Sequence, residues 1–268
     1  MTKVGFIGLG EQGKPMAINL AKAADLDLMV YDLRAEPVEE LVALGARRAG
    51  SLREVAAHSD VIEVIVVDDA QVEAVVLGDD GVVDGARPGS IVVIHSTIRP
   101  ATVRKVAAAC ASRGIGVIDA PVSGGARGAQ TRSMCYMVGG DKELVDRCRP
   151  IFETSGKNIF HLGALGAGMT AKLAHQVIIC LNVLAAGEGM MLAQKAGLDL
   201  AMMQEVIRAG GASSRVADNW VKYQPTASAA KLWRKDLMLA LECAEELGLD
   251  LHGASAAQQL IEKVLVRE

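Results

Sequence analysis

The 268-residue sequence contains few aromatic residues and no excess of positive charge. Aromatic residues make up 3% of the chain, and the formal net charge is -4. Proteins that bind nucleic acids generally present a basic surface, often with aromatic side chains that stack on bases. The composition therefore argues against nucleic-acid binding.

Cysteine is scarce and has no metal-binding or disulfide spacing. None of the five cysteines belongs to a C-x-x-C pair, and the histidines show no zinc-site spacing. An odd number of dispersed cysteines is more typical of reduced cytosolic thiols than of a disulfide framework. We therefore predict a cytoplasmic protein without a metal site.

Long hydrophobic runs are also missing. No uninterrupted stretch of about 18 apolar residues occurs, which argues against a transmembrane span. The apolar run after Lys3 is broken by glycines and lacks a small-residue cleavage site, unlike a signal peptide. We expect no membrane association, and the hydrophobic fraction of 51% is ample for a large core.

Short apolar strands alternate with helical stretches in the first part of the chain. Strand-like runs occupy residues 3–10, 26–33, 61–67, 89–96 and 114–121. This alternation predicts βαβ units in a mostly parallel sheet that is covered by helices on both faces. From about Gly166 onward only helical patterns remain.

We therefore predict an α/β protein with two domains. Residues 1–163 would form a Rossmann-type, doubly wound dinucleotide-binding domain. Residues 164–268 would form an all-helical substrate and dimerisation domain, entered by a long, buried interdomain helix. About 100 residues are close to the lower limit for an independent core, so we expect a homodimer or homotetramer assembled through the helical domain.

A glycine-rich turn follows the first strand and opens the first helix. Gly8, Gly10 and Gly13 have the G-x-G-x-x-G spacing, and Gln12 lies within the same turn. In this context the spacing indicates a dinucleotide site, with the pyrophosphate at the helix N-terminus. The alternative is a turn that requires glycine only for its backbone conformation.

An acidic residue ends the second strand. Asp32 stands where a carboxylate can accept a hydrogen bond from the 2′-hydroxyl of NAD and repel the 2′-phosphate of NADP. Arg34 lies two residues further on, and its guanidinium group could bind that phosphate. We favour NAD, with NADP as the alternative; Asp32 could also be an ordinary loop residue at a strand end.

The long apolar helix carries polar residues near its start. Lys172, His175 and Gln176 are three or four residues apart and share one helical face. A buried ammonium group needs a partner or a function. Desolvation would lower the lysine pKa from about 10.4 toward a value useful for proton transfer. The alternative is a lysine that extends its amine to solvent.

Five motifs, in order along nearly the whole chain, make the sequence resemble the β-hydroxyacid dehydrogenases. This family includes 3-hydroxyisobutyrate dehydrogenase and tartronate semialdehyde reductase. The motifs are "GFIGLGEQGKPMAINL", "HSTIRP", "DAPVSGGARGA", "GAGMTAKLAHQ" and "KDLMLALECAEELG". The ordered set is specific, whereas any one motif would be only suggestive.

The resemblance implies a role for each residue that matches a motif. Lys172 would be the catalytic lysine, and Gln176 stands where relatives carry a substrate-binding asparagine. Thr97 and Lys235 would lie near the nicotinamide. The substrate carboxylate would be held by one further turn, which comprises Ser123, Gly124 and Gly125. Asp236 follows Lys235 at the opening of a helical segment, where a charged pair is often merely solvated.

Four departures from the family pattern concern the substrate rather than the chemistry. Gln176 is one methylene longer than asparagine. His175, a further candidate for substrate binding, replaces a second asparagine and introduces a possible titrating group; the alternative is a satisfied core or interface histidine. Arg132 replaces a glycine and could favour a more acidic substrate. Residues 212–233 are shorter than their counterpart, which often carries aromatic side chains that line the pocket.

The resemblance implies an oxidoreductase that transfers a hydride between NAD(H) and a small β-hydroxy acid or its semialdehyde. Lys172 would act as general acid or base. Two alternatives remain: an imine reductase-like enzyme, against which Lys172 counts, and a dinucleotide-binding sensor without catalytic activity.

Overall fold

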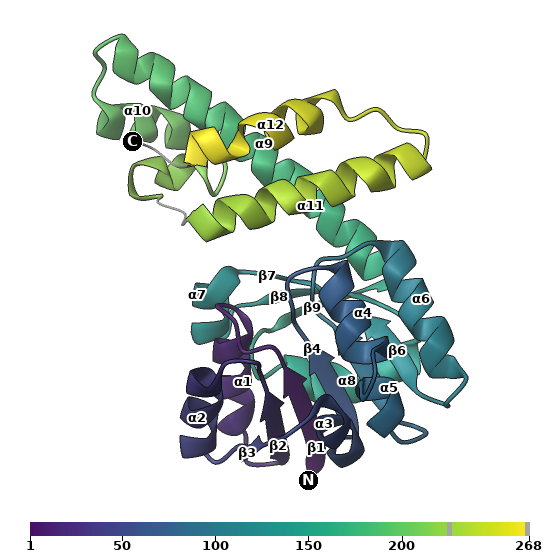
Figure 1. Ribbon diagram of the computed structural model, residues 1–268. Helices are drawn as coiled ribbons and strands as arrows, with labels where there is room; N and C mark the ends of the chain where they lie inside the picture. Colours follow the sequence, from purple (N-terminus) through teal and green to yellow (C-terminus); the bar gives the residue numbers. More distant parts are fainter. Residues whose placement is uncertain (224–226, 266–268) are drawn as a thin grey trace. The chain divides into compact units, whose positions relative to one another are not determined.

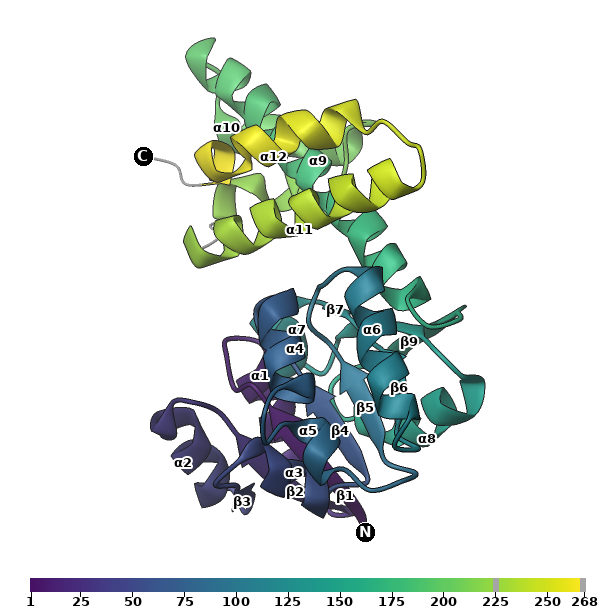
Figure 2. The ribbon, with the colours of Figure 1, turned by 45° about the vertical axis from the view of Figure 1, so that its right-hand side comes forward.

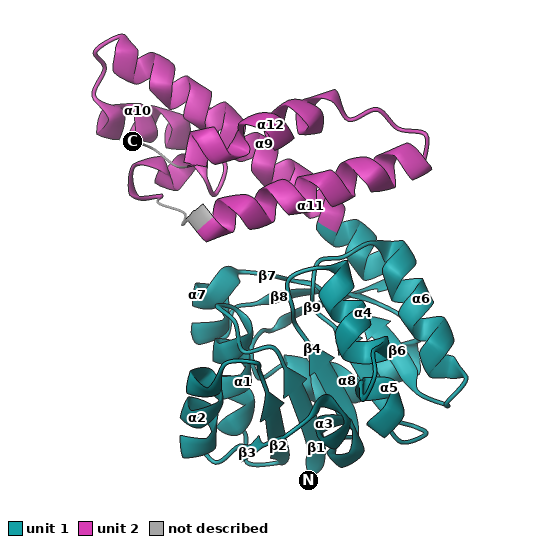
Figure 3. Cartoon of the chain, viewed as in Figure 1, with its two compact units in different colours: residues 1–172 teal, residues 173–268 magenta. Residues whose placement is uncertain are grey.

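The computed structural model describes residues 1–223 and 227–265, which form two compact units. Unit 1 comprises residues 1–172 and unit 2 comprises residues 173–268 (Figure 3). The family resemblance thus agrees with the architecture, because an α/β unit is followed by a helical one. The predicted division between residues 163 and 164 stays a prediction.

Unit 1 contains a nine-stranded sheet with strand order β3-β2-β1-β4-β5-β6-β8-β7, and β9 pairs with β8. Pairing is parallel except where β8 meets β6 and β7. The strands are β1 (Thr2–Ile7), β2 (Leu26–Tyr31), β3 (Arg47–Arg48), β4 (Val61–Val64), β5 (Ile91–Ile94), β6 (Gly116–Asp119), β7 (Val122–Ser123), β8 (Cys135–Gly139) and β9 (Asn158–Gly163).

Helices cover both faces of this sheet, as Figures 1 and 2 show. One face packs against α1 (Gly13–Ala21), α2 (Ala35–Ala43), α7 (Gly125–Gln130) and α8 (Lys142–Phe152). The other packs against α3 (Leu52–His58), α4 (Asp69–Leu77), α5 (Val82–Gly85) and α6 (Pro100–Ala111). Successive strand residues alternate between these cores, so strands that are apolar throughout are buried on both sides.

Five strands were expected from the sequence, and β1, β2, β4, β5 and β6 confirm them. The strands β7, β8 and β9 were not expected. In particular, the predicted division between residues 163 and 164 comes directly after β9, which pairs in parallel with β8. β8 pairs antiparallel with β6 and β7, which the βαβ pattern does not predict. β8, α8 and β9 do form a βαβ unit, but the sequence interpretation did not recognise these two strands.

Unit 2 is helical throughout its described residues. It contains most of α9 (Ala167–Lys195), and α10 (Leu200–Ala209), the 3-10 helix η1 (Ala217–Lys222), α11 (Ala227–Glu246) and α12 (His252–Leu265). Their core includes Trp220, Leu237 and Ile261. Residues 224–226, within the segment thought to be shortened, lie outside the described residues.

The long helix α9 departs in part from the expectation of a fully buried element. Ile178, Met191 and Leu192 are 62%, 58% and 73% exposed. By length and composition alone, α9 also meets the criterion for a membrane span, with a mean hydropathy of 1.6 over its most apolar window. Core helices of water-soluble proteins meet the same criterion, so this finding is weak evidence for a membrane.

Candidate active site

The glycine turn connects β1 to α1 and depends on close backbone packing. Gly8 has a φ of +97°, and a Cβ atom there would lie 2.1 Å from the Ile65 carbonyl oxygen. A Cβ atom on Gly13 would lie 2.1 Å from the Gly8 carbonyl oxygen. Both positions therefore require glycine for the fold itself.

Gly10 differs from these two glycines. A Cβ atom there would meet no atom of the described chain within 4 Å. Its φ is not in the left-handed region, so the fold alone does not require glycine at this position. Open space beside the N-terminus of α1 suits the close approach of a phosphate group. Gln12, the partly buried N-cap residue of α1, borders the same N-terminus.

Asp32 contacts this turn directly. Its Oδ2 accepts a hydrogen bond of 2.6 Å from the Leu9 N–H. Arg34 donates from its backbone N–H and its Nε to Asp32 Oδ1, and from Nη2 to the Leu9 carbonyl oxygen. Asp32 and Arg34 are thus both connected to the glycine turn, at the carboxyl end of β2, and the residues present fit a dinucleotide.

The environment of Asp32 keeps it ionised. Burial by itself would raise the pKa of the carboxyl group. Hydrogen bonds from the Arg34 side chain and from the Arg34 and Leu9 backbone N–H groups, together with the Arg34 charge, outweigh burial and lower this pKa. The carboxylate is therefore available as an acceptor.

The predicted carboxylate-binding turn lies between β7 and α7. Ser123 is the last residue of β7, and Gly124 and Gly125 follow with φ angles of +131° and +60°. Residues with side chains rarely adopt these angles, so both positions favour glycine. Arg132 follows α7 with a φ of +52°, which explains why glycine suits that position in the family pattern.

Lys172 lies beside this turn. Its side chain is buried, with 8% of the residue exposed, and Nζ donates a 2.9 Å hydrogen bond to the Val122 carbonyl oxygen. Val122 immediately precedes Ser123, so the structure brings Lys172 and the predicted carboxylate-binding turn together. Thr97, partly buried, lies in the loop between β5 and α6.

The start of α9 is held by a residue to which sequence reasoning assigned no role. Asp119, fully buried at the end of β6, accepts 2.7 Å hydrogen bonds from the Gly166 and Met169 N–H groups. Burial raises the pKa of Asp119, and the backbone donors partly offset this rise. An acidic residue at the carboxyl end of a predicted strand was the signal that could have revealed this cap.

Gln176 and His175 belong to a polar chain in unit 2. His175 Nδ1 lies 3.2 Å from Gln176 Oε1, and Gln176 Nε2 donates a 2.7 Å hydrogen bond to Asp236 Oδ2. Lys235 Nζ lies 3.1 Å from Asp236 Oδ1. Contrary to the sequence interpretation, Lys235 and Asp236 do not open a helix. They lie well inside α11, and Asp236 is 6% exposed because it faces α9.

Two family models together match nearly the whole chain. Residues 3–163 match the NAD binding domain of 6-phosphogluconate dehydrogenase. Residues 166–267 match the model described as the NAD-binding domain of NADP-dependent 3-hydroxyisobutyrate dehydrogenase.

Individual relatives are similar over almost their full length. The 2-hydroxy-3-oxopropionate reductase of Escherichia coli is 39% identical over 265 residues, covering 96% of this chain and 89% of that protein. The NAD-dependent L-serine dehydrogenase of Pseudomonas aeruginosa is 38% identical over 260 residues, covering 96% and 87%. The crystal structure of 3-hydroxyisobutyrate dehydrogenase from Salmonella typhimurium superposes with a TM-score of 0.87 at 33% identity, covering 98% and 94%.

Proposed function

Because the chain belongs to the β-hydroxyacid dehydrogenase family, whose named members are nicotinamide-dependent dehydrogenases and reductases, we propose that it interconverts a small β-hydroxy acid and its semialdehyde. The observation that carries this proposal is the buried Lys172 amine beside Ser123. It supplies a proton-transfer group next to a turn suited to a carboxylate.

The bound nicotinamide supplies the hydride acceptor for oxidation and the hydride donor for reduction. Lys172 takes the proton of the substrate hydroxyl group during oxidation and returns a proton to the carbonyl oxygen during reduction. Burial favours the neutral form of an amine over its ammonium form, which suits the role of base. The Val122 carbonyl, as a hydrogen-bond acceptor, orients the amine.

Substrate and cofactor are positioned by the remaining residues of unit 1. The Ser123 hydroxyl and the N–H groups of Gly124 and Gly125 bind the substrate carboxylate. We assign NAD as the preferred cofactor, because Asp32 presents an ionised carboxylate at the turn. Arg34 already donates to Asp32 and is therefore engaged rather than free to bind a 2′-phosphate.

Gln176 and Lys235 supply the polar groups of unit 2 in this proposal. The family resemblance assigns Gln176 to a substrate oxygen and Lys235 to the nicotinamide end of the cofactor. Asp236 supports the assignment because it holds the Gln176 amide on one side and the Lys235 amine on the other. His175, in contact with Gln176 Oε1, fixes the orientation of that amide.

We also propose a homodimer formed through unit 2. Apolar side chains of α9 and α10 and of the turn between them are more than half exposed, namely Met191, Leu192, Leu198, Met202 and Val206. An apolar surface of this kind on two consecutive helices marks a protein interface. Sedimentation equilibrium would test the assembly, and a monomer at micromolar concentration would refute it.

The test of the chemistry compares Lys172→Ala with Lys195→Ala, a control at the end of the same helix. Purified protein is assayed by nicotinamide absorbance with 3-hydroxyisobutyrate, glycerate, 3-hydroxypropionate, threonate and L-serine. We expect Lys172→Ala to lower kcat by at least ~100-fold and to retain its affinity for NADH, because general acid–base catalysis contributes rate enhancements of that size. The control should retain wild-type turnover.

Three results would contradict the proposal in different ways. Normal turnover by Lys172→Ala would remove this lysine from the mechanism. Reduction of cyclic imines without turnover of any hydroxy acid would indicate an imine reductase. NADH binding without turnover of any compound would indicate a sensor.

A further inference from the structure

A pair of ionisable residues with no part in the proposed mechanism is buried in the sheet of unit 1. Glu63 lies in β4 and His95 directly follows β5, and each is only 2% exposed. His95 Nε2 lies 3.2 Å from Glu63 Oε1. Removing two ionisable groups from water is unfavourable unless their contacts compensate, so their arrangement calls for a physical account.

The second nitrogen of the His95 ring shows which backbone group the pair contacts. Nδ1 lies 2.7 Å from the Ala120 carbonyl oxygen, and a carbonyl oxygen can only accept. Nδ1 must therefore carry a hydrogen and donate it. The contact between Nε2 and Glu63 needs one further hydrogen, which either partner can supply. Glu63 thereby fixes the ring so that Nδ1 points at Ala120.

Aromatic side chains hold the ring from other directions. The Tyr136 and Phe152 rings meet His95 edge to face, with centroids 6.0 and 5.9 Å away. Tyr136 and Phe152 also stack on each other at 4.9 Å. Glu63 and His95 thus link β4, β5 and the segment that follows β6 through a chain of two polar contacts.

Ala120 connects the Glu63–His95 pair to the candidate active site. Ala120 begins the short segment that leads to Ser123. Within that segment, the Val122 carbonyl oxygen accepts a hydrogen bond from the Lys172 amine. Three successive carbonyl oxygens in this segment accept hydrogen bonds: Ala120 from His95, Pro121 from the Met137 N–H, and Val122 from Lys172. The position of the first therefore constrains the position of the third.

We propose that Glu63 and His95 are positioning residues, which act through Ala120 to place the Val122 carbonyl, and with it the Lys172 amine and Ser123. This inference rests on the proposed function, because it concerns the placement of the groups that act in that reaction. Neither side chain contacts a reacting group. Their effect should appear in turnover of the hydroxy acid and not in cofactor affinity.

Substitutions at His95 separate the donor from the bulk of the ring. His95→Leu fills the space but donates nothing to Ala120. His95→Asn places an amide N–H near the position of Nδ1. We expect His95→Leu to lower kcat/KM for the hydroxy acid at least tenfold at saturating NAD, and His95→Asn to recover to within threefold of wild type. Glu63→Gln keeps a hydrogen bond to Nε2 and should also stay within threefold.

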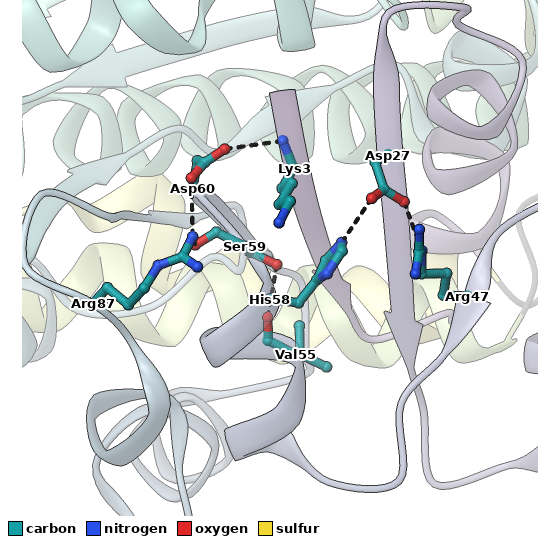
Figure 4. Close-up of polar contacts among 8 residues, drawn as sticks. All are labelled: Lys3, Asp27, Arg47, Val55, His58, Ser59, Asp60 and Arg87. Atoms are coloured by element: carbon teal, nitrogen blue, oxygen red, sulfur yellow. Dashed lines mark hydrogen bonds and ion pairs between the residues drawn. The ribbon is translucent and has the colours of Figure 1, made fainter. Parts of the chain in front are cut away.

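A matched control lies at the amino-terminal ends of strands in the same sheet. His58 Nε2 lies 3.5 Å from Asp27 Oδ2, and its side chain is 12% exposed, so it is another largely buried histidine beside a carboxylate (Figure 4). It sits near the amino ends of β1 and β2, among Lys3, Arg47 and Asp27. His58→Leu removes a histidine–carboxylate contact that involves no hydrogen bond to the segment before Ser123, and should leave kcat/KM within twofold of wild type.

The dissociation constant for NADH is measured by fluorescence for every variant. Values within threefold of wild type, combined with the loss in His95→Leu and its recovery in His95→Asn, support the positioning role. Wild-type kcat/KM in a folded His95→Leu variant would overturn it. A His95→Asn variant as impaired as His95→Leu, or a parallel loss of NADH affinity, would also overturn it.

Nuclear magnetic resonance of the wild-type protein provides a test that does not depend on variant folding. In protein containing 15N-labelled histidine, His95 should show a protonated, slowly exchanging Nδ1. A ring with Nδ1 unprotonated would refute the inference. A wild-type protein without hydroxy acid turnover would instead refute the proposed function, whereas an active wild type with an active His95→Leu variant would refute this inference alone.

Discussion

Gly10→Ala should separate cofactor binding from folding. Its Cβ atom would meet no atom of the described chain within 4 Å, and Gly10 has no left-handed φ. The substitution should therefore leave the fold intact and stabilise it by up to about 1 kcal/mol, because alanine restricts the unfolded chain. The same methyl group would occupy the space that a pyrophosphate needs in order to reach the backbone N–H groups.

We expect the NADH affinity of Gly10→Ala to fall at least tenfold, or about 1.4 kcal/mol of binding free energy. A phosphate oxygen must come within about 2.9 Å of an N–H nitrogen, whereas a carbon atom requires roughly 3.5 Å. Fluorescence titration with NADH and urea unfolding of the same sample give the two quantities independently.

Gly8→Ala is the matched control for this experiment. Gly8 has a φ of +97°, and its added Cβ atom would lie 2.1 Å from the Ile65 carbonyl oxygen. Backbone strain and steric overlap should together reduce the free energy of unfolding by about 2–5 kcal/mol. Wild-type NADH affinity in Gly10→Ala would refute the reasoning, and so would a loss of stability as large as that of Gly8→Ala.

Three further predictions concern strain, charge and thiol burial. Arg132→Gly should raise the free energy of unfolding by about 0.5–1 kcal/mol, because relief of the left-handed backbone at φ +52° exceeds the entropic cost of glycine; a lower urea midpoint would contradict this. The pKa of Asp32 is lowered by its contacts, so its stabilising contribution is present above the unfolded-state value near 3.9 and is lost as the pH falls toward the depressed folded-state value. The stability difference between wild type and Asp32→Asn should therefore be constant from pH 8 to about pH 6 and shrink below about pH 5 in urea titrations, and a difference that grows on acidification would exclude this account. Burial raises the pKa of Cys110 to about 11 and that of Cys148 to about 12. Mass spectrometry should therefore find both thiols unalkylated by iodoacetamide at pH 8 in the native protein and alkylated in urea. Alkylation in the native protein would disprove their burial.

The sequence revealed the parts of the fold that follow a repeating physical pattern. Unbroken apolar runs and their alternation with helices predicted the parallel strands and the helical second part. The antiparallel strand β8 breaks the βαβ rule, and β7 has only two residues, Val122 and Ser123. Neither periodicity nor the crossover rule can indicate such elements.

The candidate site was predictable where a residue's neighbours in sequence are also its neighbours in space. The glycine turn is an example, whereas Asp32 could be located from its place at the end of the second predicted strand, although it contacts Leu9. The partners of Asp236 and His95 depend on how distant elements pack, and spacing along the chain does not give them. A signal existed for Glu63, which stands within the apolar strand run at residues 61–67 on the same sheet face as His95. Glu63 is opposite Val93, so His95 is its diagonal neighbour on the adjacent strand, and such a pair can be recognised once the strand order and register are known.

The Asp119 cap determines how this chain can be divided into fragments. A fragment that ends at residue 163 would retain the buried carboxylate but lose its Gly166 and Met169 donors. Such a fragment would lose the hydrogen bonds of this carboxylate and the residues that cover it, and should be less stable than a longer one. A separately expressed dinucleotide-binding unit should therefore extend through the first turns of α9, to Lys172 or beyond.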